Sequence, residues 1–211
     1  MKKTIISCVL FLTAVTAFSQ TPMKTAAEAK LSASDLAVKI ADRILATTTY
    51  EFKNTKTGKT YKSVKNLPLD MNVKVACKYN NWHYTNGVTH IALMELADKT
   101  GAKKYDDYVL KNMNFVFNEG NLDFFKKQYD QAMKNEGWYG VRKLSWHMIF
   151  RGKRLDDNGP MGASLIDLQM KHPNNSFLNY INETAEHLNY GEPRLADGTI
   201  ARIWPHENTI W

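Results

Sequence analysis

Cysteine is scarce in this sequence of 211 residues, which contains two, Cys8 and Cys77. Cys8 lies in an apolar run near the N-terminus, so removal of that run would leave Cys77 alone. A lone cysteine cannot form an internal disulfide, whatever compartment the protein enters. The composition, 44% hydrophobic and 23% charged, is typical of a globular protein. We therefore expect the fold to depend on an ordinary hydrophobic core.

Signatures of several catalytic classes are also missing. The sequence contains no glycine-rich phosphate loop and no nucleophile elbow. Two adjacent aspartates, Asp156 and Asp157, could contribute to a metal site, but no cysteine or histidine pattern accompanies them. The six histidines are scattered, without metal-ligand spacing: His83, His90, His147, His172, His187 and His206. We expect no metal site.

Long apolar runs are limited to one segment at the N-terminus, residues 4–18. It follows Lys2 and Lys3 and precedes Ser19, so that small residues stand at both positions that a signal peptidase reads before Gln20. A short membrane anchor is the alternative, but spanning a bilayer takes roughly 20 apolar residues. We expect residues 1–19 to be a cleaved signal peptide and the mature protein to be periplasmic or secreted.

The charge is mildly basic, with a formal net value of +7, and removal of Lys2 and Lys3 lowers it by two. The densest group of lysines falls in a Thr/Asn/Gly-rich segment, residues 53–65, which is typical of a solvated loop or hairpin. A nucleic-acid-binding arm would need a tighter basic run or a stripe on one helix. A modest positive balance suits an acidic saccharide as partner.

Helical periodicity dominates the rest of the chain. A long connection with room for a short strand spans residues 47–72, and glycines 137 and 140 interrupt the pattern further on. Residues 199–203 are consistent with a short strand or an extended loop. Helices are expected near residues 34–46, 82–97 (ended by Thr100-Gly101), 105–116 (closed by Gly120), 122–133, 142–150, 161–168 and 177–188 (capped by Asn174 or Asn175). The pattern predicts an all-α fold; an ordinary bundle or a tetratricopeptide-like array is the alternative, although no fixed period recurs.

Three segments combine aromatic rings with hydrogen-bonding groups, as sugar-binding sites do. They are residues 81–87, 154–163 and 198–211. In the second segment, Asp156 and Asp157 precede a predicted helix whose N-terminus would stabilise their charge. A simple helix cap, worth about 1 kcal/mol, is the alternative for these aspartates.

The same segments carry a family resemblance. The run from Leu155-Asp156-Asp157 to Met161-Gly162-Ala163 resembles the Leu-Asp-Asp-x-Gly-x-Met-Gly-Ala segment of glycoside hydrolase families 88 and 105. The Trp82-x-Tyr84-x-x-Gly87 pattern, with Leu96, Thr100-Gly101 and Tyr105 after it, is similar to the opening helices of family 105. Trp204-Pro205-His206 and Trp211 resemble the stretch that leads to a Trp-x-Asp motif there. The resemblance covers most of residues 75–211.

This resemblance implies an (α/α)6 barrel of six helical hairpins, of which residues 20–211 would be the N-terminal part, about half. We expect such a part to expose apolar helix faces that further hairpins would cover. Poor solubility and no turnover are then expected of residues 1–211 alone. A monomeric product that melts cooperatively would contradict this view.

The resemblance also implies the reaction: removal of a 4,5-unsaturated uronic acid from lyase-generated oligosaccharides, mainly unsaturated galacturonyl-rhamnose in family 105. No metal or organic cofactor is needed. The main catalytic aspartate of the family lies two residues after the position that Trp211 matches. The second family aspartate matches Asp157, with Asp156 as the rival. The residues expected to bind substrate are Trp82, His83, Tyr84, Arg202, His206 and Trp211.

Two other interpretations remain. A non-catalytic carbohydrate-binding or interaction protein would use the same aromatic residues as an open platform. A purely structural interpretation buries Trp82 and leaves Asp157 as a helix cap.

Overall fold

The computed structural model describes residues 32–150 and 155–201, apart from the side chains of residues 155–157. Residues 38–201 belong to one compact unit; residues 32–37 belong to another unit and are considered separately. The described chain is mostly helical, which confirms the all-α prediction, while the six-hairpin barrel stays a prediction. No helix within these ranges is long and apolar enough to span a bilayer.

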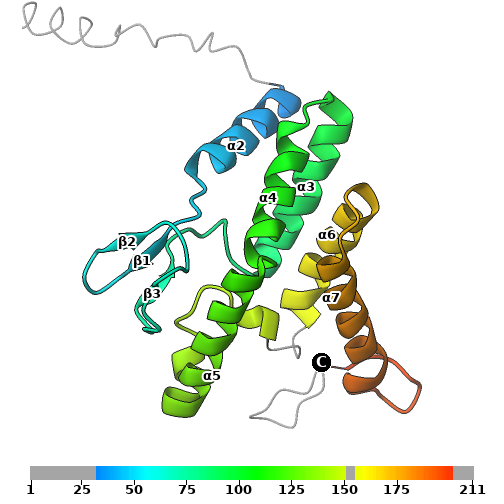
Figure 1. Cartoon of the computed structure of the whole chain (residues 1–211). Helices are drawn as coiled ribbons and strands as arrows, with labels where there is room; N and C mark the ends of the chain where they lie inside the picture. The colour runs from blue at the N-terminus through cyan, green and yellow to red at the C-terminus, as the bar shows by residue number, and fades with distance from the viewer. Residues whose placement is uncertain (1–31, 151–154, 202–211) are drawn as a thin grey trace, which may run out of the picture. The chain divides into compact units, whose positions relative to one another are not determined.

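Figure 1 shows the elements in chain order. The helices are α2 (Ala33–Thr47), α3 (Tyr84–Thr100), α4 (Lys104–Val116), α5 (Glu119–Val141), α6 (Leu155–Lys171) and α7 (Asn175–Glu186). A 3-10 turn, η1 (His147–Phe150), precedes α6, and a π turn, η2 (His187–Gly191), follows α7. The strands are β1 (Phe52–Asn54), β2 (Thr60–Tyr61) and β3 (Val73–Val75).

Several helix ends were predicted correctly because local chemistry defines them. Gly101 ends α3 in the left-handed region, with φ of 70°, and its N–H donates to the carbonyl of Ala97 at 2.8 Å. Asn174 caps α7 by accepting from the N–H of Ser176 at 2.9 Å. Gly137, with φ of 58° and ψ of −146°, interrupts α5 where the sequence predicted a break.

Two predicted boundaries were wrong. Gly120 does not close α4: it lies inside α5, because Asn118 caps the new helix by accepting from the N–H of Asn121. The helix expected over residues 142–150 is reduced to η1, because the chain between Val141 and His147 forms turns through short-range backbone hydrogen bonds.

Toward the C-terminal end, Ile200 forms an isolated bridge with Arg194 rather than a strand.

A small antiparallel sheet, in the order β2-β1-β3, occupies the long connection before α3. Phe52 is opposite both Tyr61 and Val75 and is completely buried. Its ring lies 5.7 Å from the rings of Phe115 and Phe124, so the sheet is fixed to α4 and α5. Strands of two or three residues are too short to produce an alternating sequence pattern.

The α3 and α6 helices pack side by side and run in the same direction (Figure 1). Gly87 near the start of α3 contacts Pro160 near the start of α6. At the other end, the ammonium of Lys171 on α6 lies 2.7 Å from the Asp98 carboxylate on α3 and 3.2 Å from that of Asp106 on α4. The first turns of α3 and α6 therefore lie at the same end of the pair.

Each of these two helices also carries exposed apolar side chains. Val88 on α3 is 55% exposed, and Met170 on α6 is 73% exposed. Tyr84 and Ile166 are exposed on the same two helices. The expectation that further hairpins would cover apolar helix faces, and that of poor solubility, stay predictions.

A polar pair lies inside the α3–α4 packing. His90 and Asn112 are both almost fully buried, and the Asn112 amide nitrogen lies 3.2 Å from Nε2 of His90. An amide nitrogen only donates, so Nε2 accepts and the imidazole is neutral. Burial lowers the pKa of His90 from 6.5 to about 4.

We predict that His90 makes stability fall in acid. Its folded pKa is depressed, so the stabilisation is fully present above pH 6.5 and is lost as the pH falls toward about 4. A shift of this size corresponds to roughly 3 kcal/mol in the free energy of unfolding. Urea denaturation between pH 7 and 4 measures the free energy of unfolding of the wild type and of His90→Gln. This free energy should fall less steeply with decreasing pH in the variant.

The matched control is His172→Gln, which changes a partly exposed histidine beyond the end of α6. Parallel pH profiles for the wild type and His90→Gln would contradict the assignment.

Candidate active site at the start of two parallel helices

The close approach of α3 and α6 depends on Gly87. A Cβ atom at this position would lie 2.4 Å from the carbonyl carbon of Pro160 and 2.5 Å from the nitrogen of Met161. Both atoms belong to the backbone and cannot rotate away. Glycine is therefore required here, and it brings the Trp82 segment beside the first turns of α6.

Asn158 on α6 connects the segment before α3 with α7 near this contact. Its Oδ1 accepts from Nε1 of Trp82 at 3.2 Å and from the hydroxyl of Tyr180 on α7 at 3.5 Å. An indole N–H only donates, which identifies the accepting atom as oxygen and fixes the orientation of the amide. Asn158 is 5% exposed; its bond from Trp82 is buried, and its bond from Tyr180 is partly buried.

The segment before α3 is held by amide side chains. Asn86 donates to the carbonyls of Lys78 and Asn81, each at 3.0 Å. Asn80 donates to the carbonyl of Thr49, also at 3.0 Å. Buried backbone carbonyls need such partners, so the segment that leads to Trp82 has a defined conformation.

His83 and Tyr84 stand at the open start of α3. The imidazole of His83 caps the helix by accepting from the N–H of Thr85 at 3.4 Å, and it lies 4.6 Å from the ring of Tyr84. Both side chains are accessible from solvent, and their role in substrate binding stays a prediction.

Trp82 lies in the core instead. It is 1% exposed, and its ring is 5.0 Å from Tyr180 and 6.4 Å from both Phe117 and Trp146. A buried indole presents no open face to a sugar. In the described structure Trp82 positions Asn158, in agreement with the structural interpretation of this residue.

The remaining predicted residues are placed only in part. Asp156 and Asp157 follow Leu155 in the first turn of α6, so neither occupies the capping position before the helix. The side chains of these aspartates, and the whole of Arg202, His206 and Trp211, lie outside the described residues. Among the residues that the structure describes, no group of three or more His, Cys, Asp or Glu could hold a metal ion.

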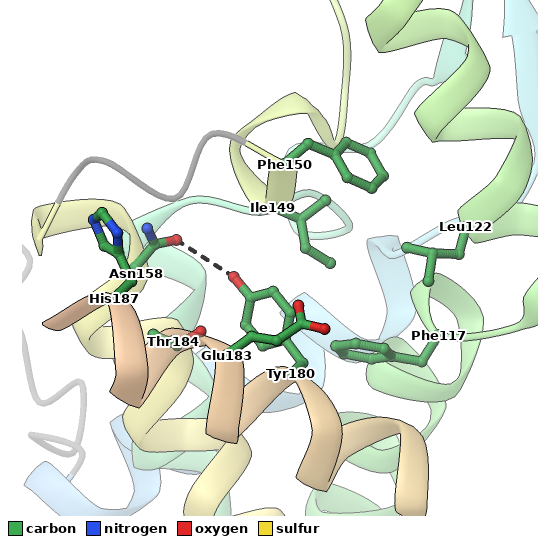
Figure 2. Close-up of a pocket in the computed structure, with 9 residues that line it drawn as sticks. All are labelled: Phe117, Leu122, Ile149, Phe150, Asn158, Tyr180, Glu183, Thr184 and His187. Atoms are coloured by element: carbon green, nitrogen blue, oxygen red, sulfur yellow. Dashed lines mark hydrogen bonds between the residues drawn. The ribbon is translucent and has the colours of Figure 1, made fainter. Parts of the chain in front are cut away.

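A pocket of about 390 Å³ opens beside Asn158 (Figure 2). One wall is apolar and comes from the end of α4, the start of α5 and η1. The other wall is largely polar and comes from α6, α7 and η2. In order, the lining residues are Phe117, Leu122, Ile149, Phe150, Asn158, Tyr180, Glu183, Thr184 and His187.

The polar wall has a negative character. Burial raises the pKa of Tyr180 above its ordinary value, and the charge of Glu183 adds to this shift, so the phenol stays a hydrogen-bond donor. Nε2 of His187 lies 3.1 Å from the Glu192 carboxylate, which occupies that nitrogen. Glu183 is the exposed carboxylate of the wall.

Sequence reasoning did not single out Asn158, Tyr180 or Glu183. Asn158 stands inside the Asp-Asp-x-Gly segment at a position that the pattern leaves open. Tyr180 and Glu183 follow the helical period of α7, so their sequence context indicates only an amphipathic helix. Their shared pocket exists only after α6 and α7 pack together.

We predict that Gly87→Ala lowers stability by roughly 1–3 kcal/mol, because the added methyl group forces α3 and α6 apart. Urea denaturation measures the loss, and increased quenching of Trp82 fluorescence by acrylamide would report its exposure. Gly162→Ala is the matched control, since a Cβ there meets nothing within 4 Å. This control should be neutral or should stabilise α6 by about 0.5–1 kcal/mol. Equal effects of the two substitutions would contradict the packing argument.

Comparison with known proteins connects this geometry to a family. A search of curated proteins found no match to the chain. The model of Glycosyl Hydrolase Family 88 matches residues 54–211, about three quarters of the chain. The match includes both helices at the site, α3 and α6, together with the pocket on α7. The chain therefore belongs to glycosyl hydrolase family 88, a family of glycoside hydrolases of the unsaturated uronyl hydrolase kind.

Proposed function

We propose that this protein removes 4,5-unsaturated uronic acids from oligosaccharides that polysaccharide lyases release. The observation that supports this most directly is the placement of the Asp156-Asp157 turn, within a family 88 match, directly before a pocket-lining residue. The similarity to family 105 favours an unsaturated galacturonyl-rhamnose type of substrate. The signal-like residues 1–19 favour a periplasmic or secreted location, where such oligosaccharides are produced.

The proposed reaction is hydration of the C4=C5 vinyl ether. A carboxylic acid delivers a proton to C4, and a water molecule adds to C5 while a carboxylate accepts its proton. The hemiketal at C5 then opens, and the bond from C1 to the linking oxygen breaks. The second sugar leaves with its hydroxyl, and no electron donor or acceptor is required.

Asp157 is proposed to hold the substrate rather than to deliver the proton. Its place in the first turn of α6 stabilises a negative charge, because the N-terminal end of a helix carries a partial positive charge. An ionised carboxylate accepts hydrogen bonds from sugar hydroxyls. The resemblance assigns the proton donor to a position after Trp211, and Asp156 remains the rival for the Asp157 role.

The uronate carboxylate is proposed to bind near the first turns of α3 and α6. These turns lie at the same end of a parallel pair, so the partial positive charges of the two helix N-termini add to a positive potential there. His83 and Tyr84 border this end. Arg202, with His206 as an additional donor, is the proposed partner of the carboxylate, because guanidinium pairs with carboxylates in a bidentate manner.

The non-catalytic interpretation is less well supported. It needs an open platform formed by residues 82–84, and Trp82, the largest of these rings, is buried. What remains exposed is His83 and Tyr84, which suit the edge of a cleft better than a flat stacking surface.

We predict that residues 1–211 bind an unsaturated uronyl disaccharide more tightly than its saturated counterpart. Asp157→Asn should weaken binding of the unsaturated ligand about tenfold or more, because it removes a charged hydrogen-bond acceptor. Isothermal titration calorimetry measures both affinities. Binding is the appropriate readout, because Asp157 is proposed to hold the substrate rather than to deliver the proton.

Asp167→Asn is the matched control, because it makes the same change on α6 about three turns further along. Equal affinity for the two disaccharides, or an equal loss in both variants with unchanged circular dichroism, would refute the proposal.

A further inference from the structure

We infer that the pocket between α7 and η1 binds one uncharged sugar ring. This inference rests on the proposed function, in which that ring is the sugar linked to the uronate. The pocket begins at Asn158, directly after the Asp156-Asp157 turn in the chain. The pocket and the turn could therefore contact two neighbouring rings of one oligosaccharide.

The first argument is an amide donor at the pocket that has no acceptor among the described residues. Trp82 and Tyr180 both use Oδ1 of Asn158, so Nδ2 of this amide points elsewhere. No hydrogen bond joins Nδ2 to any residue within the described ranges. The side chain is 95% buried and lines the pocket, which makes Nδ2 a preset donor to an oxygen of a ligand.

The second argument is the apolar wall that faces Asn158. Phe150 and Leu122 lie across the pocket from Asn158, and Phe117 packs beside Tyr180 with the ring centroids 5.6 Å apart (Figure 2). A sugar ring has a C–H face that packs on aromatic and aliphatic groups and hydroxyls that need directed partners. A volume of about 390 Å³ lies in the lower part of the range for small-molecule sites, about 300–1,000 Å³.

The third argument concerns charge. Glu183 accepts hydrogen bonds from hydroxyls but repels a carboxylate, and the Nε2 side of His187 is occupied by Glu192. Among the residues that the structure describes, no Lys or Arg lines this pocket. We therefore assign the uncharged ring to the pocket. The uronate stays assigned to the first turns of α3 and α6, where the helix N-termini offset the charge of Asp156 and Asp157.

The test uses residues 1–211 and three probes. These are methyl glycosides of neutral hexoses and 6-deoxyhexoses, the methyl glycoside of the unsaturated uronic acid, and the unsaturated disaccharide. Ligand-observed NMR and calorimetry report binding. Glu183→Gln should weaken the binding of the neutral glycosides and of the disaccharide about tenfold. It should leave the affinity for the methyl uronide unchanged.

Asn158→Asp provides a second variant. This substitution keeps an oxygen that accepts from Trp82 and Tyr180 but removes the Nδ2 donor. It should therefore also weaken the binding of the neutral glycosides. Glu186→Gln, on the same helix but outside the pocket, should change no affinity. Thermal melting confirms that each variant is folded.

The outcomes separate the two proposals. Neutral glycosides that bind in a Glu183-dependent way, without any binding of uronyl ligands, would support the pocket and refute the proposed function. If uronyl ligands bind and no neutral glycoside does, the inference that the pocket binds an uncharged ring is wrong. The proposed function is then still supported. Equal losses for the methyl uronide and the neutral probes in Glu183→Gln would also overturn the pocket.

Discussion

The oxygen of one buried amide connects the helices that form the candidate site. Asn158 accepts from Trp82, which precedes α3, and from Tyr180 on α7, while its own backbone belongs to α6. Each bond is modest by itself, but leaving a buried donor unpaired costs about 1–3 kcal/mol. Trp82 and Tyr180 would both lose their acceptor if α6 shifted. The amide therefore fixes the position of the helix that begins with the Asp156-Asp157 turn.

This arrangement explains why an aromatic residue of the motif is buried. Trp82 contributes its single donor to Asn158 and fills the space between Phe117, Trp146 and Tyr180. Gly87 permits the close helix contact that makes this bond possible. The orientation of Asn158 leaves its amide nitrogen without an acceptor among the described residues, at a pocket that we propose binds an uncharged ring. Packing and the proposed ligand recognition thus involve the same side chain.

The sequence predicted the elements whose signals are local. Gly101 and Asn174 marked helix ends through backbone geometry and capping, and Gly137 marked the interruption of α5. The prediction that Gly120 closes α4 was wrong, because a glycine after one helix can also belong to the next. Asn118 caps α5, and Gly120 lies within that helix. For the candidate site, the sequence singled out segments 81–87 and 154–163. It did not single out Asn158, Tyr180 and Glu183 as individual residues, because the residues that each of them contacts are distant in the chain. Exposure could not be predicted for Trp82, since sugar platforms and cores use the same residue type.

The central claim is that an unsaturated uronyl oligosaccharide lies with its charged ring at the first turns of α3 and α6 and its uncharged ring in the pocket beside Asn158. A crystal structure of the chain with an unsaturated uronyl disaccharide tests this most directly. The account predicts the uronate carboxylate near His83 and the start of α6, with the second ring between Phe150 and Glu183. A disaccharide bound in the reverse orientation, or away from both helix starts, would contradict it.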